Sequence, residues 1–271
     1  MARLSMNEMT TYRWSFDNDV AEYRAAGIPA IGVWRQKLSD YGEEKGIELL
    51  AETGLPVSNL LWAGGFTGSC GHSFRESVDD AIEAIRLAAA LKAGCLVVYS
   101  GGRAGHTHNH ARRLLIEAIR ELVPLAEDLR VTLAIEPMNP GCAADCTFLT
   151  SLADAEAVMD TIGSPRVQLA FDAYQFGAEP TAIELLPRFA GRIAIVHLAD
   201  GKTPIEQEQN RTRLGDGVVP LAEVVAALSA AGYNGDYDVE LIGQEIEATD
   251  YRELLEHSKA AYERLFSPVV A

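Results

Sequence analysis

Short apolar segments rich in β-branched residues alternate along the chain with longer segments whose apolar residues recur at helical spacing. The first kind is typical of buried β-strands and the second of amphipathic helices. The predicted strands are residues 3–7, 30–34, 57–62, 95–100, 131–136, 167–172, 193–198 and 237–241. The predicted helices are residues 17–26, 37–53, 74–92, 108–129, 151–162, 181–189, 219–231 and 249–266.

This alternation predicts parallel strands joined by right-handed crossovers. Eight such units fit one (β/α)8 barrel, and the chain length of 271 residues is close to the usual size of about 250. An open doubly wound sheet with a dinucleotide site is the alternative, but Gly-x-Gly-x-x-Gly does not follow the first strand. The glycine-rich run 100–105 has the spacing of neither phosphate-binding loop. We therefore expect an α/β fold with a single barrel domain over residues 1–271.

Composition narrows the possible partners and the compartment. Asp and Glu number 39 against 23 Lys and Arg, a net charge of −16, which argues against binding to nucleic acid or to an anionic membrane. The sequence shows no signal peptide and no membrane span. Four cysteines are too sparse for a disulfide framework, and no second Cys/His pair accompanies Cys142 and Cys146. We expect reduced thiols in a cytoplasmic protein.

Candidate chemistry lies where the predicted strands end, because barrel active sites form at the carboxyl ends of the strands. Four consecutive strands each place one group there that can bind a metal: Glu136, Asp172, His197 and Glu240. As unpaired charges in the barrel mouth these groups would be costly, and a shared divalent cation removes that cost. Three carboxylates and one imidazole suit Mn²⁺, Mg²⁺ or Co²⁺ better than a thiolate-binding ion.

Five motifs make the chain resemble the xylose isomerase-like TIM barrels of the sugar phosphate isomerase/epimerase superfamily. They are Glu-Pro-Met-Asn after strand five, Phe-Asp at strand six, Val-His-Leu-Ala-Asp-Gly at strand seven, Leu-Gly-Asp-Gly at 214–217 and Val-Glu at strand eight. The resemblance implies that the four groups bind one metal ion, often Mn²⁺. By analogy with the ketose epimerases of the family, Glu136 and Glu240 are the acid/base pair. The resemblance also implies a dimer or a tetramer.

The sequence departs from the epimerase pattern after strand six. Epimerases of this family commonly carry Asp-x-x-His there, with the histidine contacting substrate, whereas here Gln175 follows Asp172. A neutral amide thus stands in place of an ionisable group, which puts the ketohexose epimerase pattern in doubt. The related apurinic endonucleases need a histidine-rich site for three metals, and the acidic net charge also opposes that function.

Further substrate contacts are expected from loops and aromatic residues at the same face. His106 and His108 follow strand four, and Lys202 and Arg213 flank the loop after strand seven. The two histidines could contact substrate or lie in a solvated loop. Lys202 and Arg213 could bind a substrate group or form surface ion pairs. The three tryptophans, Trp14, Trp34 and Trp62, follow or end strands one to three and are expected to form an aromatic wall for a sugar ring or an aglycone. Gln175 completes the expected substrate-binding set.

These features favour a divalent-metal-dependent isomerase or epimerase of a keto sugar or related polyol. Glu136 and Glu240 would take and return the proton next to a metal-bound carbonyl. A lyase or dehydratase that expels a β-substituent from a keto sugar, keto-inositol or keto-glycoside shares the first half of that reaction and is the alternative. A non-catalytic sugar-binding module is a third possibility, but it would not require a full set of metal ligands.

Overall fold

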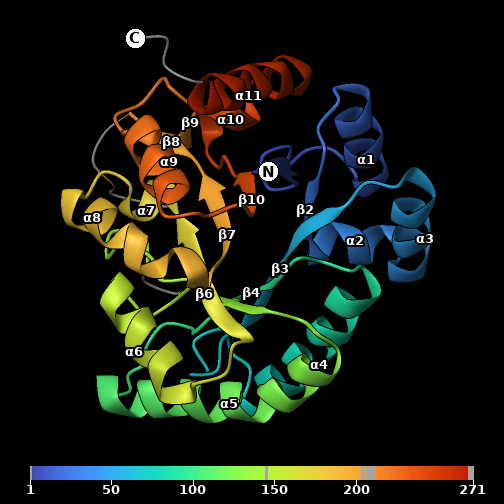
Figure 1. Ribbon diagram of the computed structural model, residues 1–271. Helices are drawn as coiled ribbons and strands as arrows, with labels where there is room; N and C mark the ends of the chain where they lie inside the picture. Colours follow the sequence, from blue (N-terminus) through green and yellow to red (C-terminus); the bar gives the residue numbers. More distant parts are fainter. Residues whose placement is uncertain (1, 144–145, 203–204, 206–210, 268–271) are drawn as a thin grey trace.

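Parallel strands close into a barrel surrounded by helices (Figure 1). The computed structural model describes residues 2–143, 146–202, 205 and 211–267, so both ends of the predicted 1–271 domain lie outside it. The order around the barrel is β1-β10-β7-β6-β5-β4-β3-β2, which confirms the predicted fold. The barrel strands are β1 (Arg3–Asn7), β2 (Ile31–Trp34), β3 (Val57–Gly64), β4 (Leu96–Tyr99), β5 (Leu133–Ile135), β6 (Val167–Asp172), β7 (Ile193–Leu198) and β10 (Asp236–Val239).

Helices cover the outside of the barrel in chain order, from α1 to α3 in blue through α4, α5 and α6 in green to α8, α9 and α11 in orange and red (Figure 1). Local sequence signals start several of them. Ser73 begins α4 with a reciprocal capping box to Glu76, and Thr107 and Ser151 cap α5 and α6 through their side chains. The longer helices are α1 (Phe16–Ala25), α3 (Glu43–Thr53), α4 (Phe74–Ala90), α5 (His108–Asp128), α6 (Leu152–Ile162), α8 (Pro180–Phe189), α9 (Leu221–Ala230) and α11 (Tyr251–Phe266).

The predicted helix 37–53 is wrong as one element. It is two helices, α2 (Arg35–Tyr41) and α3, separated at Gly42, whose φ of 107° only glycine adopts readily. Gly46 allows the close contact inside this pair, since a Cβ there would lie 2.1 Å from a methyl carbon of Leu38. The two helices place Trp34, Arg35 and Lys37 at the mouth of the barrel.

Short elements at the strand ends were not predicted. Helix α7 (Ala173–Phe176) follows β6 directly, and α10 (Gln244–Glu247) follows the end of β10. A two-stranded antiparallel sheet, β8 (Asp200–Gly201) with β9 (Arg211–Thr212), lies between β7 and α9. All of these lie on the side of the barrel where the candidate chemistry was expected, so they shape the site.

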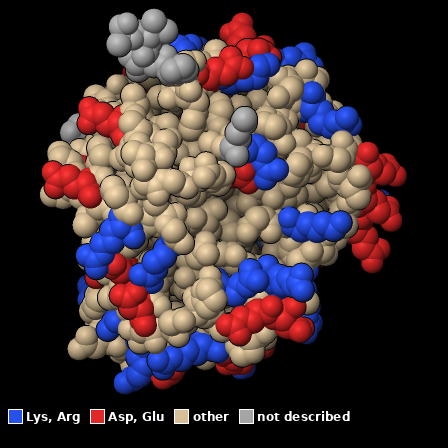
Figure 2. All heavy atoms as spheres, viewed as in Figure 1, with Lys and Arg blue, Asp and Glu red and all other residues tan. Residues whose placement is uncertain are grey.

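The outer face in Figure 2 carries charged side chains mostly toward its edges, around a broad area without them. Within the part of the chain that the structure describes, none of the helices combines the length and apolarity needed to cross a membrane. The helix-facing apolar residues of the strands and the inner faces of the helices form one large buried core. That core holds the strand ends of the site in place.

Candidate active site

The four predicted metal-binding residues come together at one point of the barrel mouth. Asp172 ends β6 and His197 lies in β7, where the two are register partners. Glu136 follows β5 directly and Glu240 follows β10 directly, each one residue beyond its strand. Neighbouring strands in the order β10-β7-β6-β5 therefore supply the four groups, and their possible ligand atoms all lie within 4.8 Å of one another.

All four side chains are buried, and several of their polar atoms lack a hydrogen bond. Among the described residues, neither ring nitrogen of His197 nor Oε2 of Glu136 has a hydrogen-bond partner. His197 Nδ1 is 3.5 Å from Oε1 of Glu136 and 3.5 Å from Oε2 of Glu240, too far for a good hydrogen bond. Buried polar atoms in this condition are rare in native proteins and call for a bound ligand or ion.

Arg211 contacts the cluster directly, and the sequence analysis did not single it out. Its guanidinium group is buried and donates to Asp172 Oδ2 at 2.9 Å, to Glu240 Oε2 at 3.0 Å and to the carbonyl oxygen of Glu240 at 2.8 Å. It also lies over the ring of Tyr174, 4.9 Å from the ring centre. Arg211 belongs to the two-residue strand β9. Arg213, predicted as a possible substrate contact, lies two residues further on and is half buried, and its contact with substrate stays a prediction.

Burial and mutual repulsion set the charge state of the cluster. Desolvation raises the pKa of Glu136 above its usual value, and it raises that of Asp172 to about 7 despite the attraction of Arg211. Burial alone would lower the pKa of His197, but the charges of Glu136 and Glu240 outweigh it and raise that pKa to about 10. The carboxylates therefore favour positive charge at this point, and a divalent cation would take the place of the proton on His197.

The donor set fits a divalent cation. Ligands to such ions lie at about 2.0–2.2 Å, so opposite ligand atoms are at most about 4.4 Å apart, and a closure of a few tenths of an ångström satisfies that limit. A cation there would also give the unpartnered atoms of His197 and Glu136 a partner. Oxygen and imidazole donors together are compatible with Mn²⁺, Mg²⁺, Co²⁺ or Zn²⁺. The buried cluster can thus hold a metal ion.

The carboxylate of Asp200 folds the loop that carries Arg211. Oδ1 accepts from the backbone N–H groups of Gly201 and Val219, and Oδ2 accepts from those of Gly215 and Gly217. A Cβ at Gly217 would lie 2.1 Å from Oδ1 of Asp200, so the Leu-Gly-Asp-Gly motif needs glycine there. Because Asp200 also pairs with Thr212 across the β8–β9 sheet, this hydrogen-bonded turn fixes Arg211 over the cluster.

Gln175 is fully buried and holds the loop after β5. Its Oε1 accepts from the backbone N–H of Asn139 at 2.9 Å, and the Asn139 side chain donates to the carbonyl oxygen of Gln175 at 3.4 Å. This contact links α7, directly after Asp172, to the segment that follows Glu136. Gln175 therefore joins the two segments that follow Asp172 and Glu136. Its contact with substrate stays a prediction.

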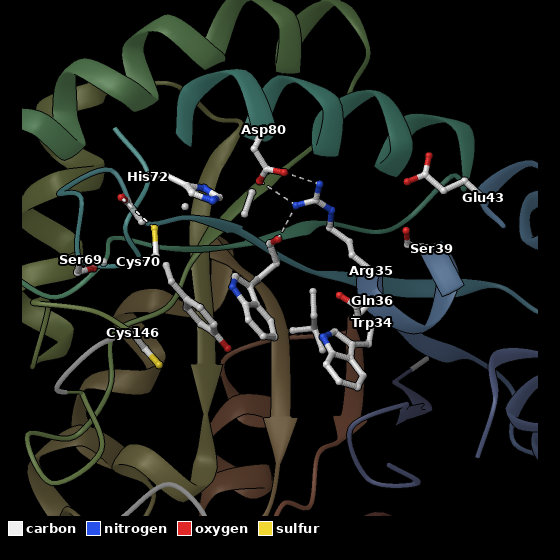
Figure 3. A pocket seen from close by; sticks show the side chains of 17 residues that line it. Trp34, Arg35, Gln36, Ser39, Glu43, Ser69, Cys70, His72, Asp80 and Cys146 are labelled. Carbon is white, nitrogen blue, oxygen red and sulfur yellow. Dashed lines mark hydrogen bonds and ion pairs between the residues drawn. The ribbon is translucent and has the colours of Figure 1, made fainter. Parts of the chain in front are cut away.

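The tryptophans lie at the mouth as expected, but not as one wall. Trp34 and Trp62 line the same pocket of about 550 Å³ (Figure 3). Trp14 instead packs edge-on against Tyr251, with ring centres 5.2 Å apart, and shares a different hollow of about 420 Å³ with Trp34.

The remaining predicted substrate contacts lie outside the four-residue cluster. His106 lies in the loop before α5 with its ring 4.6 Å from that of His110, and His108 packs edge-on against Phe148. Lys202 pairs with Glu245 in an exposed ion pair, which is the surface role already considered for it. Their contact with substrate stays a prediction.

The family model of the xylose isomerase-like TIM barrels matches residues 20–261. The chain belongs to this family. Protein SMc04130 of Sinorhizobium meliloti has the same fold, with a TM-score of 0.90, 28% identity and 98% of each chain covered. The IOLI protein, whose structure is described with a bound zinc atom, has a TM-score of 0.84 at 21% identity, with 97% of each chain covered.

Curated relatives are sugar isomerases and epimerases. The inosose isomerase of Bacillus velezensis is 30% identical over 56% of this chain and 54% of its own length. The D-psicose 3-epimerase of Enterocloster bolteae is 31% identical over 46% of this chain and 38% of its own length. The matched region thus spans about half or less of these relatives. A D-allulose 3-epimerase from Methylomonas, solved with D-allulose, shares the fold with a TM-score of 0.77 at 17% identity, over 98% of this chain and 97% of its own.

Proposed function

We propose that the protein is a divalent-metal-dependent isomerase or epimerase of a keto sugar or related polyol. The observation that carries the proposal is the convergence of Glu136, Asp172, His197 and Glu240, with buried polar atoms that lack partners. The curated isomerases and epimerases support the reaction class. Mn²⁺ is the proposed ion, because three carboxylates with one imidazole form a mainly oxygen site.

Glu136, Asp172, His197 and Glu240 would hold the ion. When bound, such an ion supplies Lewis acidity toward a carbonyl group and an adjacent hydroxyl group. Glu136 and Glu240 come from strand ends on either side of β6 and β7. From there one carboxylate can remove the proton next to the carbonyl group and the other can return it, on the opposite face for an epimerase.

Arg211 and burial prepare the two glutamates for this work. Desolvation raises the pKa of Glu136 above its usual value, which makes its carboxylate a stronger base. Arg211 donates to one oxygen of Glu240 and so orients that carboxylate. The site lies in a buried mouth, where bulk water is largely kept from the reacting groups.

Deuterium exchange tests this proposal directly. The Mn²⁺-loaded protein is incubated in D₂O with D-fructose, D-psicose, L-ribulose and an inosose, and the products are analysed by NMR and mass spectrometry. Deuterium at the carbon next to the carbonyl group, with skeleton and substituents intact, is the expected result. Loss of water or of a substituent would instead establish the lyase, and binding without exchange would establish a sugar-binding module.

Matched variants assign the acid/base pair. Glu136→Gln and Glu240→Gln keep the side-chain size but remove the base, so exchange should fall by about 10²–10⁴-fold. Glu223→Gln is the control, since Glu223 is an exposed acid on α9. Equal exchange in all three variants would refute the roles of Glu136 and Glu240.

A further inference from the structure

A second pocket opens at the barrel mouth beside the candidate active site. It has a volume of about 550 Å³ and is lined mostly by residues at or after the ends of β2, β3 and β4, together with Cys146 from the segment after β5 (Figure 3). None of the four cluster residues is among the described residues that line it. The cluster occupies the ends of the other half of the barrel, β5, β6, β7 and β10. The two therefore share one mouth and lie on different arcs of it.

Aromatic rings give this pocket its binding surface. Trp62 is 40% exposed although it lies within a barrel strand, and its ring is 5.5 Å from that of Tyr99. Trp34 forms a further side of the pocket and stacks on Tyr12 at 5.7 Å. Tryptophan and tyrosine rings that lie together at a pocket offer apolar faces, and flat rings or the C–H face of a sugar can pack on such faces.

The charges of the pocket select against an anion. Arg35 is the one Lys or Arg side chain among the described lining residues, and its guanidinium group is already engaged. Both of its terminal nitrogens bind Asp80, at 3.0 and 2.8 Å, and one also binds the carbonyl oxygen of Trp62 at 3.0 Å. Figure 3 shows Arg35 and Asp80 joined by dashed lines at one side of the pocket. Because Glu43 adds a further negative charge to the lining, a phosphate would meet repulsion there.

Polar side chains at the two ends suit hydroxyl groups. Gln36 and Ser39 lie on one side, and Ser69 and His72 on the other (Figure 3). A few polar donors and acceptors around a mainly apolar surface are the usual composition of small-molecule sites, and pockets of about 300–1,000 Å³ hold ligands of that kind. The volume is sufficient for a ring with substituents.

We propose that this pocket binds a neutral ring, glycosyl or aryl, that is joined to the sugar held at the four-residue cluster. That the ring belongs to the same substrate molecule rests on the proposed function, whereas binding of the ring itself does not. The substrate class is then a keto sugar carrying a second cyclic group, and the Arg35–Asp80 pair keeps phosphorylated sugars out of the pocket.

Calorimetric binding to the Mn²⁺-loaded protein tests the ring preference with two matched ligand pairs. p-Nitrophenyl β-D-glucoside is compared with methyl β-D-glucoside for an aryl ring, and isomaltulose with D-fructose for a glycosyl ring. At least one ringed ligand should bind about threefold to tenfold more tightly than its partner, as stacking on an aromatic face provides. Which pair shows the preference identifies the kind of ring.

Trp62→Ala should abolish the preference, and Trp62→Phe should restore much of it. Because Trp62 is 40% exposed and lies outside the four-residue cluster, its truncation should leave the metal content unchanged, and circular dichroism checks that the variant is folded. Asp80→Asn should raise the affinity for p-nitrophenyl phosphate several-fold, since Arg35 loses its charged partner. Trp14→Phe is the control outside the pocket.

Equal affinities within both ligand pairs, or a preference that survives Trp62→Ala, would overturn the pocket assignment. The result is separable from that of the deuterium experiment. Ring preference without exchange leaves the pocket and removes the proposed reaction. Exchange without ring preference leaves the reaction and removes the second ring.

Discussion

Single side chains decide how the candidate site balances its charge. Three carboxylates and a histidine are buried within 4.8 Å of one another, and Arg211 is the protein's own cation against two of those carboxylates. Its guanidinium group donates to Oδ2 of Asp172 and Oε2 of Glu240, and a metal ion bound at the cluster would be coordinated by the same oxygens. Arginine and a metal ion would therefore compete for the same oxygens, so we expect Arg211 to lower the metal affinity of the cluster.

Removing a ligand side chain should remove the metal. His197→Ala or Asp172→Ala takes one of four ligands from the site, and we expect the bound Mn²⁺ to fall well below one ion per chain after dialysis. Elemental analysis by mass spectrometry measures this directly. His110→Ala is the control, because His110 lies on α5 outside the cluster. Full occupancy in both ligand variants would refute the site.

Removing Arg211 should have two opposite effects. Arg211→Met keeps much of the side-chain length but leaves Asp172 and Glu240 without their cation, so the metal-free protein should lose about 3–5 kcal/mol, as breaking a buried ion pair does. The same change frees two ligand oxygens, so Mn²⁺ should bind more tightly. Urea unfolding in EDTA and calorimetric titration with Mn²⁺ measure the two effects. Weaker metal binding in this variant would contradict the competition.

At the level of helices and strands, the hydrophobic pattern along the sequence was enough to predict most of the barrel. Residues 167–172 and 193–198 were predicted as strands and are β6 and β7, because a buried parallel strand is a mostly apolar run. Glu136 and Glu240 were recognised as site residues although each lies one residue beyond its strand. The pattern therefore gave the barrel and all four groups of the cluster.

What could not be predicted is the non-periodic structure between the elements. A two-residue strand such as β9 has no hydrophobic period, so the burial of Arg211 could not be read from its neighbours. The break at Gly42 is likewise invisible to a pattern that stays helical on both sides. Arg211 and Arg213 are two residues apart, and the pairing of β8 with β9 distinguishes the buried Arg211 from the half-buried Arg213. The contact of Arg213 with substrate stays a prediction.

The hydrogen-bonded turn around Asp200 leads to a prediction about stability. Asp200→Asn replaces one carboxylate oxygen by an NH₂ group, which would face two backbone N–H donors instead of accepting from them. Because hydrogen bonds to a charged group contribute about 1.5–3 kcal/mol each, we expect a loss of about 3 kcal/mol in unfolding free energy. Urea denaturation measures it. Asp216→Asn is the control in the same motif, where the acid is exposed and little change is expected.

On the scale of the whole molecule, several buried acids contribute to the pH dependence of stability. Glu8 and Asp19 lie near Lys37 at the other side of the mouth, and desolvation raises the pKa of both. A carboxyl group whose pKa is higher in the folded protein than in the unfolded chain binds its proton more tightly when folded. The folded protein therefore becomes less stable as pH rises and that proton is lost. The net charge of −16 adds self-repulsion of the same sign. A bound divalent cation opposes this trend.

The last prediction follows from the sign of these shifts. The pKa of Asp172 is about 7 in the folded protein against about 3.9 in an unfolded chain, so its contribution to stability is lost as pH rises from about 4 to 7. The pKa of His197 is about 10 against about 6.5 unfolded, so its contribution is lost from about pH 6.5 upward. The melting temperature in EDTA should therefore fall as pH rises from 5 to 8, and Asp172→Asn should have a flatter profile below pH 7.

Added Mn²⁺ should reverse this dependence, because ligands bind metal only when they are deprotonated. The stabilisation by metal, RT ln(1 + [Mn²⁺]/Kd), should grow from pH 5 to pH 8 as Asp172, Glu136 and His197 lose their protons to the ion. Melting curves with MnCl₂ and with EDTA at each pH give the difference. The control is His197→Ala, in which the difference should be small at every pH. A metal stabilisation that is constant with pH, or equal in that variant, would show that Mn²⁺ binds elsewhere on the acidic surface and that the buried cluster is not its site.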